Sequence, residues 1–152
     1  MGKQVEVIAR GVCVKNAQLF VCHSKKAKNT YLPGGHVEFD ERAQVALVRE
    51  LEEELGVASS AGAFLGAVEH SFVQKGELHC EVNLIFELKI PSVTPENTPD
   101  ALESHIEFFW VPLGDLPAAH LEPAVLCTLL PRWVSGSPPS TRWAGAGRFL
   151  SA

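Results

Sequence analysis

Long hydrophobic runs are absent from this sequence of 152 residues. The longest apolar stretches, such as Val82 to Phe86, fall far short of the roughly 20 residues that a membrane-spanning helix needs. The N-terminal stretch also lacks the continuous apolar core and the cleavage site of a secretory signal, because Glu6 and Arg10 interrupt it. We therefore expect a cytoplasmic protein with no membrane partner.

Cysteine pairs with metal-binding spacing are also missing. The four cysteines are Cys13, Cys22, Cys80 and Cys127, with no CxxC pair and no histidine at ligand spacing. All four lie in apolar surroundings, so we expect reduced residues of the core rather than a zinc site or a disulfide framework.

An excess of basic residues is likewise missing. The formal net charge is -5, which argues against a protein that coats nucleic acid, since such proteins present a basic face. The acidic residues are concentrated in one place. Between Glu38 and Glu54 the chain has seven acidic residues and two arginines, so this short segment equals the excess of the whole chain and becomes the first candidate for a functional site.

What the chain has is an ordinary globular composition, with 46% hydrophobic and 20% charged residues. Without internal repeats and at this length, it predicts a single domain over residues 1–152. The stretch SGSPPS, which begins at Ser135, predicts a flexible tail from about that residue.

The pattern of apolar residues predicts an α/β fold. Strands are expected at residues 5–14, 19–23, 62–73, 79–90 and 106–111, where β-branched residues are frequent. From Asp40 to Leu55 the apolar residues repeat every fourth position, which indicates a helix with Asp40 as N-cap and Gly56 after its end. A second helix is expected from Pro123 to about Leu130, closed by Pro131.

Three glutamates of the first helix carry the chemistry. Glu50, Glu53 and Glu54 stand at positions i, i+3 and i+4 and therefore share one face. Carboxylates this close repel each other unless a cation or solvent compensates them, and oxygen ligands of this kind suit Mg²⁺ or Mn²⁺. The charge pattern alone also fits an ordinary solvated acidic face.

The surrounding residues decide between these interpretations. The segment from Gly35 to Val57 reads GHVEFDERAQVALVRELEEELGV and resembles the Nudix box, G-x5-E-x7-R-E-U-x-E-E-x-G-U with U an aliphatic residue. It matches at every fixed position, which are Gly35, Glu41, Arg49, Glu50, Leu51, Glu53, Glu54, Gly56 and Val57. The chain therefore resembles the Nudix hydrolases over this box and, more loosely, over most of its length.

The resemblance implies an α/β/α sandwich around a mixed β-sheet, with the box as a loop-helix-loop that holds Mg²⁺ or Mn²⁺. It implies that Glu53 and Glu54 are the principal metal ligands, with Glu50 as a further ligand or base and the Gly35 carbonyl as an additional ligand. Arg49 would orient a carboxylate at the catalytic site. Glu41 would hold the loop and Arg49 in place.

The general base and the substrate contacts stay open at this point. Besides Glu50, the base could come from outside the box, and the candidates are Glu81, Glu96, Glu103 and Glu107. An inward position of Glu81 in its apolar strand would need a metal or a hydrogen-bond donor, and an outward position is equally consistent with the sequence. Candidates for substrate contacts are Arg10, Lys25, Lys26, Tyr31, Phe39, Phe72 and Trp110, although core packing or solvation explains most of them as well.

The expected reaction is hydrolysis of a phosphoanhydride in a nucleoside diphosphate linked to another group, with a nucleotide sugar or ADP-ribose favoured. A nucleoside triphosphate is the alternative substrate. Two other classes remain to be weighed: a binding module that holds nucleotides without cleaving them, and an acidic helix that merely chelates metal. A homodimer is the family habit that the resemblance suggests.

Overall fold

The protein is described here by a computed structural model, which covers residues 2–136 and 142–147. Two five-stranded sheets form its centre. The first has the order β10-β6-β7-β1-β5, with bounds β1 (Val5–Val12), β5 (Gly34–His36), β6 (Ser60–Gln74), β7 (Glu77–Lys89) and β10 (Trp143–Gly147). The second contains β2 (Val14–Lys15), β3 (Gln18–Ser24), β4 (Thr30–Tyr31), β8 (Ile106–Pro112) and β9 (Leu121–Glu122).

Both sheets are mixed. Strand β1 pairs with β7 in parallel and with β5 antiparallel, while β6 pairs antiparallel with β7 and parallel with β10. In the second sheet β3 pairs antiparallel with β8, and β4 pairs in parallel with β9. The two-residue strands β2, β4 and β9 are too short to show a periodic pattern, and the sequence did not predict them.

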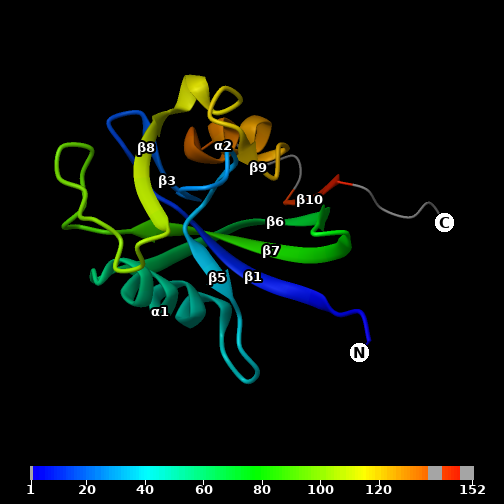
Figure 1. Ribbon diagram of the computed structural model, residues 1–152. Coiled ribbons are helices and arrows are strands. Elements are labelled where there is room, and N and C mark those ends of the chain that lie inside the picture. The colour runs from blue at the N-terminus through cyan, green and yellow to red at the C-terminus, as the bar shows by residue number, and fades with distance from the viewer. Residues whose placement is uncertain (1, 137–141, 148–152) are drawn as a thin grey trace.

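Helices lie on both sides of the first sheet. Figure 1 shows α1 (Ala43–Leu55) against one face, and α2 (Leu126–Val134) with β3 and β8 on the opposite side. A short 3-10 helix, η1 (Leu113–Asp115), follows β8. The predicted arrangement of helices around a mixed sheet is confirmed, with a second sheet added to one of the layers. Neither α1 nor α2 is long and apolar enough to cross a membrane.

Helix α1 is anchored by one apolar face and ended by a glycine. Ala46, Leu47, Leu51 and Leu55 are buried on this face. Gly56 adopts a left-handed conformation with a φ of 68°, and its N–H donates to the carbonyl of Glu52, as expected for the residue after a helix. The four-residue periodicity therefore predicted both the helix and its C-terminal end.

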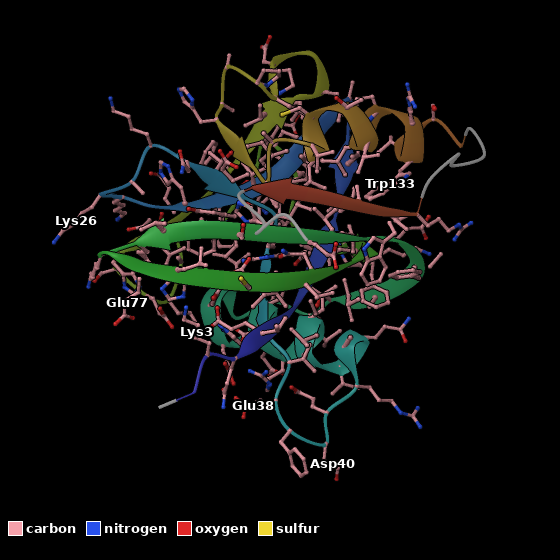
Figure 2. The ribbon with its side chains drawn as sticks, turned by 90° about the vertical axis from the view of Figure 1, so that its right-hand side faces the viewer. Lys3, Lys26, Glu38, Asp40, Glu77 and Trp133 are labelled. Carbon is pink, nitrogen blue, oxygen red and sulfur yellow. The ribbon has the colours of Figure 1, made fainter. Side chains whose placement is uncertain are left out.

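The predicted N-cap of this helix was wrong. Asp40 has a φ of 60° and lies in the preceding turn, and the helix begins only at Ala43 after Arg42. No side chain caps the first turn of α1 through a hydrogen bond. Figure 2 shows Glu38 and Asp40 at the outer end of this loop, beyond the helix and away from both sheets.

The prediction that Pro131 closes the second helix was also wrong. Helix α2 begins at Leu126, contains Pro131 and continues to Val134. Proline has no N–H for the carbonyl of Cys127, so one helical hydrogen bond is lost. The burial of Leu130 and Trp133 on either side of Pro131 carries the helix through this position.

The cysteines form no disulfide, and part of the C-terminal stretch forms a strand. All four cysteines are free; Cys13 and Cys22 are buried, and Cys80 and Cys127 are half-buried. Burial raises the pKa of the Cys22 thiol to about 12, which keeps it protonated. Most of the stretch expected to be flexible, Ser135 to Ser140, lies outside the described residues, while Trp143–Gly147 forms β10 on the edge of β6.

Candidate active site

The loop before α1 is held by Arg49 and Glu41. The Arg49 guanidinium donates from Nε to Glu41 Oε1 at 2.7 Å and from Nη2 to Glu41 Oε2 at 3.0 Å, and also to the His36 carbonyl at 3.0 Å. The backbone N–H of Glu38 donates to the same Glu41 carboxylate at 2.9 Å. The hydrogen bond from Arg49 lowers the pKa of Glu41 below its usual value, so this residue ties loop and helix together as a carboxylate.

The other side of the Arg49 fork reaches the two glutamates beside it. Nη1 donates to Glu50 Oε1 at 3.0 Å and to Glu53 Oε2 at 3.2 Å. The predicted orienting role of Arg49 therefore has a structural basis, because one guanidinium contacts three carboxylates of the box.

Two consecutive glycines bring the backbone close to these carboxylates. A Cβ atom at Gly35 would collide with the Glu50 carboxylate, and a Cβ at Gly34 would collide with the Ala9 carbonyl oxygen. Gly34 also has a φ of 140°, which other residues rarely adopt. Only glycine lets this turn pass between β1 and the acidic face of α1.

Glu54 differs from its neighbours because it has no arginine partner. It lines a cavity, and burial raises its pKa to about 7, with the charges of Glu50, Glu103 and Glu53 adding to the effect and that of Arg10 opposing it. A carboxylate in this state is stabilised by a nearby cation.

The residues present fit a hard divalent cation. Within the described chain no three His, Cys, Asp or Glu side chains already converge as a finished metal site, and Arg49 donates to both Glu50 and Glu53. The donor set nevertheless consists of carboxylate oxygens, it includes the half-buried Glu54, and its mutual repulsion is what a divalent cation would relieve. We therefore treat the acidic face of α1 as a candidate Mg²⁺ or Mn²⁺ site.

The cavity beside Glu54 has a volume of about 730 Å³. It lies between the two sheets, since β1, β6 and β7 contribute to it from one side and β3, β4 and β9 from the other. Its polar lining includes Arg10, His23, Asn29, Tyr31, Glu54, His70, Glu81, Asn83, His105 and Glu122. Its size falls within the range of small-molecule sites.

Arg10 is the only lysine or arginine among the described residues that line this cavity. Its Nη1 donates to the carbonyls of Leu32 at 3.0 Å and Gly34 at 3.4 Å, and its guanidinium lies 6.0 Å from the centre of the Tyr31 ring. These contacts fix a positive charge in the cavity, and this charge acts on both Glu54 and Glu81. Of the residues expected to contact substrate, the structure brings Arg10, Tyr31 and Phe72 to one place.

Glu81 points inward, which settles the orientation that the sequence left open. Its side chain is 13% exposed, receives a hydrogen bond from Asn83 Nδ2 at 3.3 Å, and lies 3.8 Å from His70 Nδ1. Burial alone would raise the pKa of Glu81, but the nearby His70 imidazole, the charge of Arg10 and the hydrogen bond from Asn83 hold it below its usual value. Glu81 is therefore a buried carboxylate that stays ionised.

The remaining candidates lie elsewhere. Lys25 and Lys26 are exposed and do not line the cavity, and Figure 2 shows Lys26 at the rim of the molecule. Glu107 pairs with His23 at 3.1 Å and is largely exposed, Glu96 is exposed, and Phe39 is fully exposed. The indole of Trp110 donates to Thr98 and its ring packs on Phe20, which makes it a packing residue. Glu103 is exposed, but its charge acts on Glu54.

Sequence reasoning missed several residues of the cavity. Among them, His70, Asn83 and Glu122 were not expected at the site. The alternation of β7 could have indicated Asn83, because it lies two residues after Glu81 and therefore on the same face. Nothing local marks Glu122, which arrives from β9 in the other sheet.

In a comparison with known protein families, the family model of the NUDIX domain matches residues 5–129 of the chain. A curated relative, the "Putative mutator protein MutT4" of Mycobacterium tuberculosis (strain CDC 1551 / Oshkosh), is 34% identical over 88 residues, which are 57% of this chain and only 34% of that protein. The chain thus spans about a third of that relative's length.

Solved structures show a similar fold. The MutT NUDIX hydrolase of Burkholderia pseudomallei matches with a TM-score of 0.58 and 26% identity, over 76% of this chain and 88% of its own. An ADP-ribose pyrophosphatase from Streptococcus suis 89-1591 matches with a TM-score of 0.56 and 15% identity, over 93% of this chain and 99% of its own. At 15% identity the second likeness concerns the fold alone.

Proposed function

The chain belongs to the NUDIX family, and on this premise we propose that it hydrolyses a phosphoanhydride bond in a nucleoside diphosphate linked to another group. One observation carries the proposal: the acidic face of α1 and a cavity of about 730 Å³ meet at Glu54, with Arg10 beside it. A metal-dependent site for phosphate and a space for the rest of a nucleotide are thus contiguous.

Glu53, Glu54 and Glu50, with the carbonyl of Gly35, would hold Mg²⁺ or Mn²⁺. When bound, such an ion neutralises the diphosphate and makes a water more acidic. Arg49 restrains Glu50 and Glu53 from one side, and Gly35 lets the backbone approach Glu50. Arg10, held by the carbonyls of Leu32 and Gly34, supplies a fixed positive charge for a phosphate oxygen.

We assign the general base to Glu103. Glu50 is the weaker candidate because the hydrogen bond from Arg49 Nη1 holds its carboxylate against the guanidinium. Glu81 is held by Asn83, Glu107 pairs with His23, and neither Glu107 nor Glu96 is among the charges that raise the pKa of Glu54. Glu103 is accessible to water and close enough to Glu54 for their charges to interact.

The size of the cavity supports a substrate larger than a free diphosphate, and one structural neighbour is an ADP-ribose pyrophosphatase. We therefore favour a nucleotide sugar or ADP-ribose. A nucleoside triphosphate is the second candidate, supported by the likeness to a putative mutator protein and to a MutT hydrolase. Retention of every carboxylate of the box speaks against a module that only binds nucleotides.

Hydrolysis of a nucleotide panel should require added Mg²⁺ or Mn²⁺. Glu53→Gln and Glu54→Gln should each reduce the rate by several orders of magnitude, because each removes a proposed metal ligand. Glu52→Gln is the matched control, since Glu52 is an exposed glutamate of the same helix. Full activity in excess EDTA would contradict the metal-dependent mechanism, and unchanged activity of both variants would contradict the assignment of the ligands.

Product analysis in oxygen-18 water identifies the substrate class. Mass spectrometry of reactions with ADP-ribose, nucleotide sugars and nucleoside triphosphates should give the highest kcat/KM for a diphosphate linked to a sugar. The labelled product locates the phosphorus that water attacks. A clear preference for triphosphates would replace the first candidate with the second.

A further inference from the structure

Hydrogen-bond acceptors line the cavity on β6, β7 and β9. We propose that His70, Glu81 and Glu122 form a subsite that reads the base of the nucleotide and selects a base with adjacent N–H donors, as guanine has. This inference rests on the proposed function, and of the two favoured substrates it selects a nucleotide sugar with a guanine base over ADP-ribose.

The three side chains come from different strands and meet inside the cavity. His70 lies on β6 and pairs with Glu81 on β7, and Glu122 lies on β9 in the other sheet. The imidazole is between the two carboxylates, with Nδ1 3.8 Å from Glu81 and Nε2 4.0 Å from Glu122. The side chains of His70 and Glu81 are each 13% exposed, and that of Glu122 is 33% exposed.

These distances are longer than a hydrogen bond, so His70 does not satisfy either carboxylate. Glu81 already accepts a hydrogen bond from Asn83, whereas the only described polar contact of Glu122 is the 4.0 Å approach of His70. Two carboxyl groups at 13% and 33% exposure need hydrogen-bond partners to compensate their burial. A ligand that supplies N–H groups would meet that need.

Strand geometry separates this cluster from the phosphate end. Arg10 pairs with Ile85 of β7, and Glu81 lies four residues before Ile85 on the same face of the strand. At about 3.3 Å per residue the backbones of Glu81 and Ile85 are roughly 13 Å apart, a length suited to a nucleoside, although the long Arg10 side chain still brings its charge near enough to act on Glu81. A substrate with its phosphates near Arg10 and Glu54 would therefore place its base at the cluster.

The cluster also has an apolar flank. Phe72 lines the cavity, two residues from His70 on β6, and the two rings lie 5.1 Å apart. Its other neighbour is His79, whose ring stacks on it at 5.2 Å. A planar base can thus contact an aromatic ring while its polar edge reaches the acceptors.

The chemistry of the acceptors selects the base. A carboxylate has two oxygens and accepts two parallel N–H bonds, and guanine offers such a pair in N1–H and its 2-amino group. An imidazole N–H beside the carboxylate can donate to the guanine O6. Uracil has one N–H between two carbonyl oxygens, which a carboxylate repels, and adenine offers one amino group beside a ring acceptor.

The test compares substrates that differ only in their base. With Mg²⁺ present, kcat/KM should be higher for GDP-glucose than for ADP-, UDP- or CDP-glucose. Glu122→Gln should lower the value for GDP-glucose by roughly tenfold or more and should not lower that for UDP-glucose, since the neutral amide loses the charge-assisted pair with guanine and no longer repels the uracil carbonyls. Glu69→Gln is the matched control, because Glu69 lies one residue from His70 on the opposite face of β6 and does not line the cavity.

A binding measurement separates this inference from the proposed function. Isothermal titration of the full chain in EDTA should give a lower Kd for GMP than for AMP or UMP, and Glu122→Gln should abolish the difference. Base selectivity without hydrolysis would refute the proposed function alone. Hydrolysis without base preference, or with a preference that Glu122→Gln leaves intact, would refute the subsite alone.

Discussion

Arg49 distributes one positive charge over Glu41, Glu50 and Glu53, and two different roles follow from it. Its contacts with Glu41 and the His36 carbonyl hold the loop, while its contacts with Glu50 and Glu53 restrain the acidic face of α1. A lysine in this position would keep the charge. Its ammonium group could not donate to all four acceptor groups at the fixed angles of a planar guanidinium.

Arg49→Lys should therefore affect both stability and catalysis. We expect a loss of about 1–3 kcal/mol in the free energy of unfolding, because charge-assisted hydrogen bonds to Glu41 are lost, together with a fall in kcat. Urea denaturation and steady-state kinetics measure the two effects. Arg42→Lys serves as the control, and equal behaviour of the two variants would contradict the role given to Arg49.

Glu54 makes the metal-free protein sensitive to pH. Its folded-state pKa of about 7 lies above the ordinary value of 4.5 for a glutamate, so the stability associated with its protonated form is complete below about pH 4.5. This contribution is lost as the pH rises through about 7. In EDTA, we therefore compare the urea midpoints of Glu54→Gln and the unmodified chain at two pH values. The midpoint of the variant should exceed that of the unmodified chain by more at pH 8 than at pH 5.

Added Mg²⁺ provides the converse measurement. At pH 8 it should raise the urea midpoint of the unmodified chain more than that of Glu54→Gln, because a ligand stabilises the state that binds it. Equal responses would show that Glu54 does not contribute to the cation site.

Helix α1 was predictable because its signals are local. The four-residue repeat gave its buried face, and Gly56 gave its end. The start was wrong because Asp40 takes part in a turn whose shape depends on the Glu41–Arg49 contact rather than on capping. Strand β10 had no local signal, since its sequence WAGAG has no β-branched residue.

The residues of the site divide in the same way, into those with a local sequence signal and those without one. The box fixed the identity of Glu50, Glu53 and Glu54 through spacing within one helix. His70 and Glu122 become neighbours only when two sheets face each other, and no pattern within either strand encodes that.

The anchoring of α1 predicts a large difference between two of its apolar residues. Leu51 is fully buried, and Leu51→Ala should cost about 2–5 kcal/mol in the free energy of unfolding. Val45 is 55% exposed, and Val45→Ala should change it by less than about 0.5 kcal/mol. Urea denaturation at one pH compares them, and similar losses would mean that the helix is not held by this face.

At the scale of the whole molecule, the cavity lies between the two sheets. The site therefore exists only while the two sheets keep their positions relative to each other. Arg10, His70 and Glu81 come from the first sheet, whereas Tyr31 and Glu122 come from the second.

The homodimer that the family resemblance suggests stays a prediction, and sedimentation equilibrium of the full chain tests it.

Strand β10 has a consequence for the behaviour of the protein at high concentration. It covers the edge of β6 from Ala67 to Ser71, where the Ala67 N–H also donates to the Arg142 carbonyl. An uncovered edge of a long strand is a template for intermolecular pairing. A chain shortened after Gly136 should therefore self-associate and aggregate as its concentration rises, while the full chain does not; light scattering of both over one concentration series would show it, and equal scattering would mean that β10 has no protective role.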